Sequence, residues 1–317
     1  MNHFIAGSSD EVVAVGSHRT KPTSLPGSGI HCHSLWMQFG RTQALAGMTL
    51  EIAEGEAVGI IGRNGCGKST LFRCIVGLEV PDQGHVEIGG GLSRLQWLEK
   101  LGFVPDTLSA YDWMSCGQAI EFVAAHQPRF DAGWCRELER LLAIDRKAMV
   151  RSLSRGMQAR LAMVLGLLHN PQYVLLDEPL LGVDVLTQDL ALEALSRLRS
   201  RAGTTMLIAS HQVGDLARIV DRVVFMDRGA VVECVAAESL MGGTLRVLVR
   251  GVPRDWTPPF EIVLSRWLDG AAVLTVEGDA VLVECAIRSQ FPDAVVQCLP
   301  LSIHDACADR LRAMEVH

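Results

Sequence analysis

A glycine-rich segment at residues 62–69 constrains the fold of this chain more than any other feature. It reads Gly-Arg-Asn-Gly-Cys-Gly-Lys-Ser and fits the pattern G-x-x-x-x-G-K-[ST]. An apolar run at 57–61 precedes it, and a helical pattern at 68–77 follows. A strand, a glycine loop and a helix N-terminus in this order turn backbone N–H groups inward around a phosphate chain. The segment therefore predicts an α/β core with a phosphate loop (P-loop). Lys68 would reach the β- and γ-phosphates, and Ser69 would offer its hydroxyl to Mg²⁺.

A second segment ends an apolar strand in two adjacent carboxylates, Asp177 and Glu178. Ligands bind at the carboxyl ends of strands in open α/β sheets. Asp177 is suited to hold Mg²⁺ through water, and Glu178 to orient or deprotonate an attacking water. Taken alone, the segment is better explained as a solvated acidic turn. The phosphate loop in the same chain favours the catalytic interpretation.

A third segment opens a helix with an apolar face at 157–169. Ser154 is a natural N-cap, and Gly156 permits a close backbone approach. A second helix N-terminus is thus available to an anion. Taken alone, this segment is better explained as an ordinary capped helix.

The remaining pattern predicts how the core is organised. Near-continuous apolar runs predict strands of a parallel sheet covered on both faces, at 57–61, 173–176, 205–209 and 223–226. Helices are predicted between them, at 68–77, 157–169, 187–201 and 213–220. Segments 49–52 and 85–88 predict a small antiparallel layer. The stretch 106–156 predicts a helical insertion with helices at 114–126 and 132–144.

The two ends of the chain differ from this core. Residues 1–29 carry glycine, proline and serine without periodicity, which predicts a flexible N-terminal extension. The core is expected over 30–235, and a small α+β appendage over 236–317. In the appendage we expect strands at 244–249, 272–276, 281–286 and 295–299, and a closing helix at 303–314.

Composition excludes several classes of protein. The net charge is −7, which disfavours a nucleic-acid-binding surface. Nine cysteines are scattered without a C-x-x-C pair, which predicts reduced thiols in a cytosol. No stretch carries about 18 uncharged apolar residues, so no transmembrane helix is expected. The start of the sequence has acidic residues where a signal peptide needs an apolar run, so we expect a cytoplasmic protein.

Together, the order of motifs resembles the ATP-binding subunit of an ATP-binding cassette (ABC) transporter. The order is phosphate loop, helical insertion, Leu-Ser-x-Gly signature and Asp-Glu strand end. Asp184 resembles the residue of the loop that aligns two subunits, and His211 the switch histidine after the next strand. Phe39 resembles the aromatic residue that stacks on adenine. The resemblance covers about residues 30–235.

The resemblance implies a P-loop ATPase that binds ATP and Mg²⁺. It implies catalytic roles for Lys68, Glu178 and His211, and a metal site at Ser69 and Asp177, with Asp106 at the usual metal-sensing position. The implied nucleotide-binding residues are Phe39, Gly62, Arg63, Asn64, Gly65, Cys66, Gly67, Lys68, Ser69, Thr70, Ser154, Gly156 and Asp184.

The implied partners are a separate multispanning permease and a second ATPase subunit, either identical or paralogous, closing head to tail. No nucleic-acid partner is expected. The location implied is the inner face of the cell membrane, reached through the permease.

Three departures from the family pattern matter, and the first two bear on the transport direction. Arg155 and Met157 replace the commonest signature residues, and Asp106 replaces the usual glutamine. Both variants resemble a bacterial exporter group with separate permeases, so we expect export. Leu180-Leu181-Gly182 also replaces the usual small polar lead into Asp184, so the alignment across the dimer is expected to differ in detail.

Alternatives stay open at this point. A soluble ABC ATPase acting on a macromolecular complex is the competing function, although the chain shows none of the second cassette, coiled coils or zinc modules usual there. His31-Cys32-His33 is a metal-binding candidate. A strand places its histidines on one face without a further ligand cluster in sequence, so we expect no metal. Cys66 is interpreted as a small filler rather than a redox switch.

Overall fold

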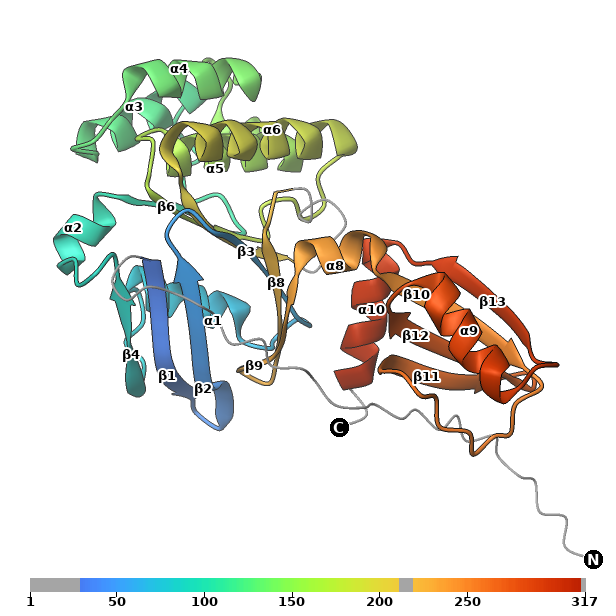
Figure 1. Ribbon diagram of the computed structural model, residues 1–317. Helices are drawn as coiled ribbons and strands as arrows, with labels where there is room; N and C mark the ends of the chain where they lie inside the picture. Colours follow the sequence, from blue (N-terminus) through green and yellow to red (C-terminus); the bar gives the residue numbers. More distant parts are fainter. Residues whose placement is uncertain (1–28, 211–218, 315–317) are drawn as a thin grey trace, which may run out of the picture. The chain divides into compact units, whose positions relative to one another are not determined.

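The computed structural model describes residues 29–210 and 219–314. The described chain divides into two compact units, one ending at Cys234 and the other beginning at Val235 (Figure 1). The N-terminal extension, most of the predicted helix at 213–220, and His211 lie outside the described residues. Within the described ranges, no helix is long and apolar enough to cross a membrane.

A six-stranded sheet forms the centre of the first unit, in the order β5-β6-β7-β3-β8-β9. The pairs from β5 to β8 are parallel. The strands are β3 (Ala57–Ile61), β5 (Leu101–Val104), β6 (Tyr173–Asp177), β7 (Thr205–Ser210), β8 (Arg222–Asp227) and β9 (Ala230–Ala236). The four predicted strands are confirmed. The two that the sequence did not indicate are the edge strands: β5 has only four residues, and every residue of β9 is half-buried or exposed.

Helices cover this sheet. They are α1 (Lys68–Val76), α2 (Arg94–Leu98), α3 (Cys116–His126), α4 (Ala132–Leu141), η1 (Val150–Ser152), α5 (Arg155–Leu167) and α6 (Val185–Ala202). Helices α3 to α6 gather on one side of the sheet (Figure 1). Trp134 fastens the insertion to the core, because its buried indole N–H donates to the Leu167 carbonyl at 2.9 Å. The predicted helical insertion is confirmed.

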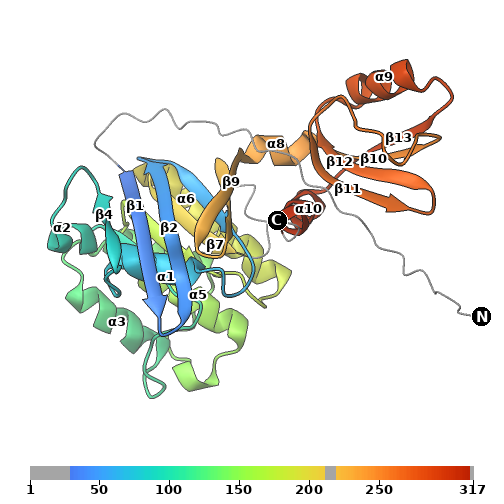
Figure 2. The same cartoon turned by 90° about the horizontal axis from the view of Figure 1, so that it is seen from below.

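A three-stranded antiparallel sheet completes the first unit, in the order β2-β1-β4 (Figure 2). Its strands are β1 (Gly29–Phe39), β2 (Thr42–Ala53) and β4 (Gln83–Ile88). Its inner face packs into the same hydrophobic cluster as α1 and the parallel sheet, through Ile30, Cys32 and Ile88 among others. The alternate residues of these strands therefore lie on the outer face.

The second unit is a four-stranded antiparallel sheet in the order β11-β12-β10-β13, with three helices. Its elements are α8 (Ala237–Gly242), β10 (Thr244–Arg250), β11 (Ile262–Leu268), β12 (Ala271–Glu277), α9 (Ala280–Gln290), β13 (Val295–Pro300) and α10 (Ile303–Met314). The strand order and directions are those of a split β-α-β sheet, with a loop in the place of its first helix.

The strand predicted at 281–286 is wrong, because this segment belongs to helix α9. The Asp279 side chain caps the helix by accepting hydrogen bonds from the N–H groups of Val281 and Leu282, at 2.8 and 3.2 Å. Val283 and Ile287 are buried four residues apart, which is helical spacing. The β-branched run misled the sequence analysis, since the capping aspartate outweighs local propensity.

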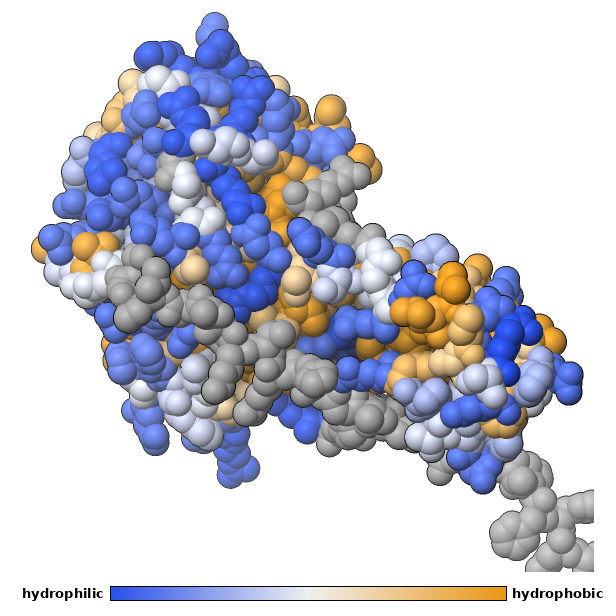
Figure 3. Space-filling view, viewed as in Figure 1, coloured by the Kyte–Doolittle hydropathy of each residue, from blue (hydrophilic) through white to orange (hydrophobic). Residues whose placement is uncertain are grey.

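Apolar side chains gather on the surface of this unit (Figure 3).

A buried carboxylate organises the second unit. Asp309 is fully buried and accepts hydrogen bonds from Thr275 at 2.7 Å, Arg246 at 2.6 Å and Arg312 at 2.9 Å. Burial alone would raise the pKa of Asp309. The hydrogen bonds from Thr275 and Arg246 and the charges of Arg246 and Arg266 outweigh it, and they hold that pKa below its ordinary value.

Candidate nucleotide site

The phosphate loop lies between β3 and α1, at the carboxyl end of a strand whose five residues are all buried. Two of its glycines have no room for a side chain. A Cβ at Gly62 would lie 2.4 Å from the Met226 carbonyl oxygen, and one at Gly67 2.3 Å from the Ala44 carbonyl oxygen. Gly67 also has φ of 109° and caps α1 without a side chain. The first-turn N–H groups of α1 are thus left without a capping side chain, which suits an anion.

Lys68 is held inside this loop although it is charged. Lys68 is only 6% exposed. The ammonium donates to the carbonyl of Gly62 at 2.8 Å and to that of Arg63 at 3.3 Å. Glu178 Oε1 lies 3.7 Å from Lys68 Nζ. The loop therefore keeps a cation pointed into a cradle of backbone groups, where it can meet a phosphate.

Asp177 lies beside the loop at the end of β6 and is 5% exposed. The Ser69 hydroxyl donates to its carboxylate, whereas its Oδ1 is buried without a hydrogen-bond partner among the described residues. Burial raises the pKa of Asp177, and the negative charges of Asp106 and Glu178 raise it further. The hydrogen bond from Ser69 and the charge of Lys68 lower the pKa but do not cancel the rise. A buried acceptor without a donor costs free energy unless a ligand satisfies it. The Ser69 and Asp177 pair therefore fits a hard cation with oxygen ligands, such as Mg²⁺.

Glu178 follows in a left-handed backbone conformation, with φ of 50°. This conformation is uncommon for a residue with a side chain and is found at functional sites. Its N–H donates to the Ala209 carbonyl at 2.9 Å, which fixes the turn after β6. The turn places the carboxylate next to Lys68. Asp106 comes from the loop after β5 and is exposed, so parallel strands bring three carboxylates to one edge of the sheet.

A second group of predicted residues lies at the N-termini of α5 and α6. The Ser154 side chain caps α5 by accepting from the Met157 N–H at 3.3 Å. The Asp184 side chain caps α6, accepting from the Thr187 N–H at 3.0 Å and the Thr187 hydroxyl at 2.9 Å. These hydrogen bonds lower the pKa of Asp184. A Cβ at Gly156 would lie 3.2 Å from an Asp184 oxygen, so glycine lets the two helix ends meet.

Two further predicted residues differ in exposure. Phe39 ends β1 with its residue 45% exposed, so the ring can stack on a flat ligand. Cys66 is 5% exposed in the phosphate loop, and burial raises the pKa of its thiol despite the nearby Lys68 charge. A raised thiol pKa disfavours the reactive thiolate, in line with the filler interpretation.

The sequence analysis missed two contacts of the second group. Thr187 completes the cap of α6, a role that its place three residues after Asp184 could have signalled. A Cβ at Gly182 would lie 2.9 Å from the Arg155 guanidinium. The unusual arginine of the signature thus packs on the unusual lead into Asp184. No local sequence signal could reveal this pairing.

Comparison with known proteins agrees with this architecture. The family model "ABC transporter" matches residues 45–181. The aliphatic sulfonates import ATP-binding protein SsuB 2 of Agrobacterium fabrum is 33% identical over 211 residues, which are 66% of this chain and 80% of that protein. An uncharacterised ABC transporter ATP-binding protein of Bacillus subtilis, YdbJ, is 26% identical over 271 residues, or 83% of this chain and 85% of that protein.

Solved structures show the same fold. The ATP-binding subunit of an ABC transporter has a TM-score of 0.61 at 24% identity, and the match covers 67% of this chain and 92% of that one. The MJ0796 cassette, a dimer bound to ADP and phosphate in a post-hydrolysis state, has a TM-score of 0.59 at 24% identity, covering 66% of this chain and 98% of that one.

These findings define the class of the protein as a P-loop ATPase of the ABC type. The chain belongs to the ATP-binding subunits of ABC transporters. The predicted fold class is confirmed. The expected export direction finds no support in the relatives, since several are named for import.

Proposed function

We propose that this chain binds and hydrolyses ATP to drive transport through a separate multispanning permease. The observation that carries the proposal is the meeting of Lys68, Asp177 and Glu178 at one edge of the parallel sheet, with Lys68 Nζ 3.7 Å from Glu178 Oε1. In the proposed complex, N–H groups from Gly62 to Thr70 and the Lys68 ammonium hold the phosphates. The ring of Phe39 stacks on the adenine.

Hydrolysis is assigned to the carboxylate of Glu178, which orients and deprotonates the attacking water. Ser69 and Asp177, with Asp106 nearby, would hold Mg²⁺, which would neutralise charge on the phosphate oxygens. Lys68 now donates to the loop carbonyls of Gly62 and Arg63, and it exchanges these for the phosphate oxygens when ATP enters. His211, which follows β7, is proposed to contact the γ-phosphate.

The proposed active form is a head-to-tail dimer, of two copies or of this chain and a paralogue. Ser154 and Gly156 of one subunit then meet the γ-phosphate held by the other subunit. The two caps described above leave these residues at a helix N-terminus, where backbone N–H groups favour an anion. Asp184 aligns the subunits. Because ATP bridges the interface and ADP cannot, hydrolysis opens the dimer.

The proposed permease contact is an exposed aromatic cluster at the start of the helical insertion. Tyr111, Trp113 and Phe122 are 57%, 64% and 49% exposed. The rings of Tyr111 and Trp113 stack with centroids 5.5 Å apart. Large exposed aromatic side chains are typical of protein interfaces. A cytoplasmic helix of the permease that packs on this cluster would place the chain at the inner face of the membrane.

For the direction of transport we propose export. The Arg155 and Met157 signature and Asp106 support it. Transport into inside-out vesicles that carry the complex would test the direction. ATP-dependent accumulation of the substrate inside these vesicles supports export. Uptake by intact cells, without accumulation in inside-out vesicles, supports import.

The mechanism is tested with Glu178→Gln. This variant keeps the size of the side chain and removes the proton acceptor. Its ATP hydrolysis should fall by about 10²–10⁴-fold, the range typical of losing a general base, while ATP binding persists. An ATP-dependent dimer should then accumulate, measured by light scattering with the permease present. Adding Ser154→Arg should abolish that dimer through bulk at the phosphate, and Ser289→Arg on exposed α9 is the matched control.

Two outcomes would count against these assignments. Normal hydrolysis by Glu178→Gln excludes Glu178 as the base. An inactive variant that binds ATP and never dimerises, with or without its permease, excludes the sandwich mechanism. Membrane fractionation separates transport from the competing soluble function, because a transporter subunit co-purifies with a multispanning protein.

A further inference from the structure

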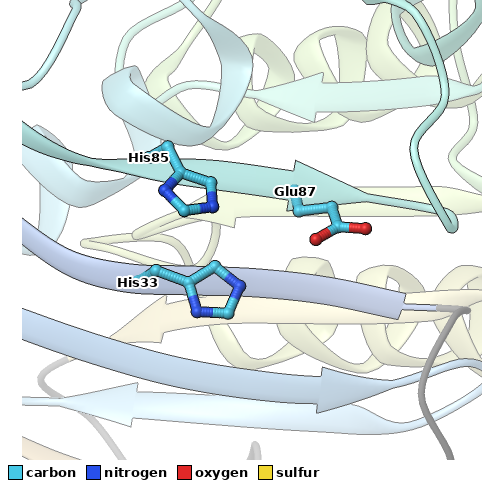
Figure 4. A group of neighbouring side chains, drawn as sticks. All are labelled: His33, His85 and Glu87. Carbon is cyan, nitrogen blue, oxygen red and sulfur yellow. The ribbon is translucent and has the colours of Figure 1, made fainter.

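A cluster of potential metal ligands lies on the outer face of the three-stranded sheet, in strands that also reach into the core. It consists of His33 on β1 and of His85 and Glu87 on β4 (Figure 4). We propose that these three side chains bind one divalent transition-metal ion of the Zn²⁺ class. The ion would be separate from the Mg²⁺ of the nucleotide site.

The register of the sheet brings these residues together although they are about fifty positions apart in sequence. β1 and β4 are antiparallel, with His33 directly opposite His85 and His31 directly opposite Glu87. Directly paired residues point to the same side of a sheet. The imidazole and carboxylate groups therefore share the outer face, while Cys32 between them points into the core. The sequence analysis expected no metal because the second strand's contribution was not visible locally.

A glycine allows β4 to approach β1 at this point. Gly84 has φ of 83°, and a Cβ there would lie 2.3 Å from the His33 carbonyl oxygen. The neighbouring Ser34 has φ of 45°, at a break in the β1 register. The backbone is thus shaped so that the imidazoles of His33 and His85 stack with ring centroids 4.7 Å apart.

The geometry is within reach of a metal site. One ligand atom from each of the three residues lies within 4.8 Å of the others. Two nitrogens bound to one tetrahedral Zn²⁺ at about 2.0–2.1 Å are about 3.3 Å apart, so the ligand atoms must close by at most about 1.5 Å. Rotation of exposed side chains supplies such a movement: His85 and Glu87 are exposed and His33 is half-buried.

The neighbour of the cluster offers a fourth ligand. His31 lies on the same face, with its ring 6.2 Å from that of His33 between centroids. Its Nε2 is buried without a hydrogen-bond partner among the described residues. Two or three imidazoles with one carboxylate select zinc, nickel or copper, whereas Mg²⁺ prefers oxygen ligands. The ion would tie the edge strand β4 to the central strand β1.

Metal binding to the full chain tests this proposal. Co²⁺ serves as the probe, because its absorption spectrum distinguishes nitrogen and oxygen ligands from thiolates, and Zn²⁺ is added in competition. We expect one equivalent of Co²⁺, displaced by Zn²⁺, without a thiolate charge-transfer band. His33→Ala, His85→Ala and Glu87→Gln should each weaken binding by about tenfold or more. The matched control is His304→Ala, on an exposed histidine of α10.

A second measurement is the thermal unfolding midpoint, with the far-UV circular dichroism of each variant as a check on folding. Zn²⁺ should raise the midpoint of the wild type and of His304→Ala, because only the folded sheet brings the three ligands together, and it should raise the midpoint of His33→Ala less. The proposal is overturned by undiminished Co²⁺ binding in a folded His33→Ala variant. It is equally overturned by thiolate ligation, or by an absence of binding to the wild type.

Discussion

Among the described residues, each unit of this chain buries one aspartate, and the two carboxylates have opposite environments. Asp309 of the second unit accepts hydrogen bonds from Thr275, Arg246 and Arg312, and its pKa is lowered. Asp177 of the first unit accepts from Ser69 and keeps a buried oxygen without a donor among the described residues, and its pKa is raised. The first carboxylate is satisfied by the fold. The second keeps an unmet acceptor, which the proposed Mg²⁺ would satisfy.

The difference shows how a stabilising charge can be distinguished from a functional one. A buried charge whose hydrogen bonds are all made holds its partner groups in place in the folded protein. Removing that charge leaves the partner groups buried without a counter-charge. A buried charge with an unmet acceptor destabilises the free protein and gains its partner from a ligand. Burial alone does not separate the two cases, since Asp177 is 5% exposed and Asp309 fully buried. The hydrogen-bond partners do.

The largest expected difference concerns hydrolysis. In the proposed mechanism Asp177 holds Mg²⁺, and a bound metal ion contributes several kcal/mol of transition-state stabilisation. Asp177→Asn should therefore reduce hydrolysis by about 10²-fold or more. Asp309→Asn should leave the rate per folded molecule unchanged. Phosphate release at saturating Mg²⁺ measures both variants. A rate loss in Asp309→Asn equal to that in Asp177→Asn would break the comparison.

The next effect is on stability, with opposite signs in the two units. Asp309→Asn leaves Arg246 and its neighbours without their carboxylate, and breaking a buried pair costs about 3–5 kcal/mol. We expect the lower end, because these arginines are partly exposed. Asp177→Asn removes an unfavourable buried charge and should hold or raise the stability of the first unit without Mg²⁺. Hydrogen exchange with mass spectrometry reports each unit separately. A destabilised first unit in Asp177→Asn would show that this carboxylate also serves the fold.

A smaller effect is expected on nucleotide affinity, from the exposed ring of Phe39 that is proposed to stack on the adenine. Phe39→Ala should weaken ATP and GTP alike, by about 1–3 kcal/mol if stacking here resembles base stacking on aromatic side chains. Phe39→Tyr is the matched control and should retain the affinity. Fluorescent nucleotide titration measures both. Loss of affinity for one nucleotide alone would mean that another residue reads the base by hydrogen bonds.

The smallest effect is the pH dependence of stability, measured by urea unfolding without Mg²⁺. The lowered pKa of Asp309 means that its stabilisation is complete above the ordinary aspartate value of about 3.9 and is lost as the pH falls through its lower folded value. The raised pKa of Asp177 means that its cost is complete above that raised value and disappears as the pH falls toward about 3.9.

The difference between Asp177→Asn and wild type should therefore vanish at a higher pH than the difference between Asp309→Asn and wild type. Overlapping windows for the two variants would contradict the opposite pKa directions.

The sequence by itself determined the elements whose signals are local. The phosphate loop, the buried strands before it and before Asp177, and the cap at Ser154 follow from contiguous residues, because glycine turns, apolar runs and capping side chains act within a few positions. The same locality explains the error at 281–286, where a β-branched run resembled a strand.

Tertiary structure alone decided which distant residues meet. The parallel sheet brings Asp106 to Asp177, the helix ends bring Arg155 to Gly182, and the antiparallel register brings His33 to His85. No periodicity within either partner encodes these pairs, because strand order and register are set by burial of the whole sheet face. The sequence therefore shows which side chains are candidate ligands, and the packing of the sheets decides which of these side chains lie together.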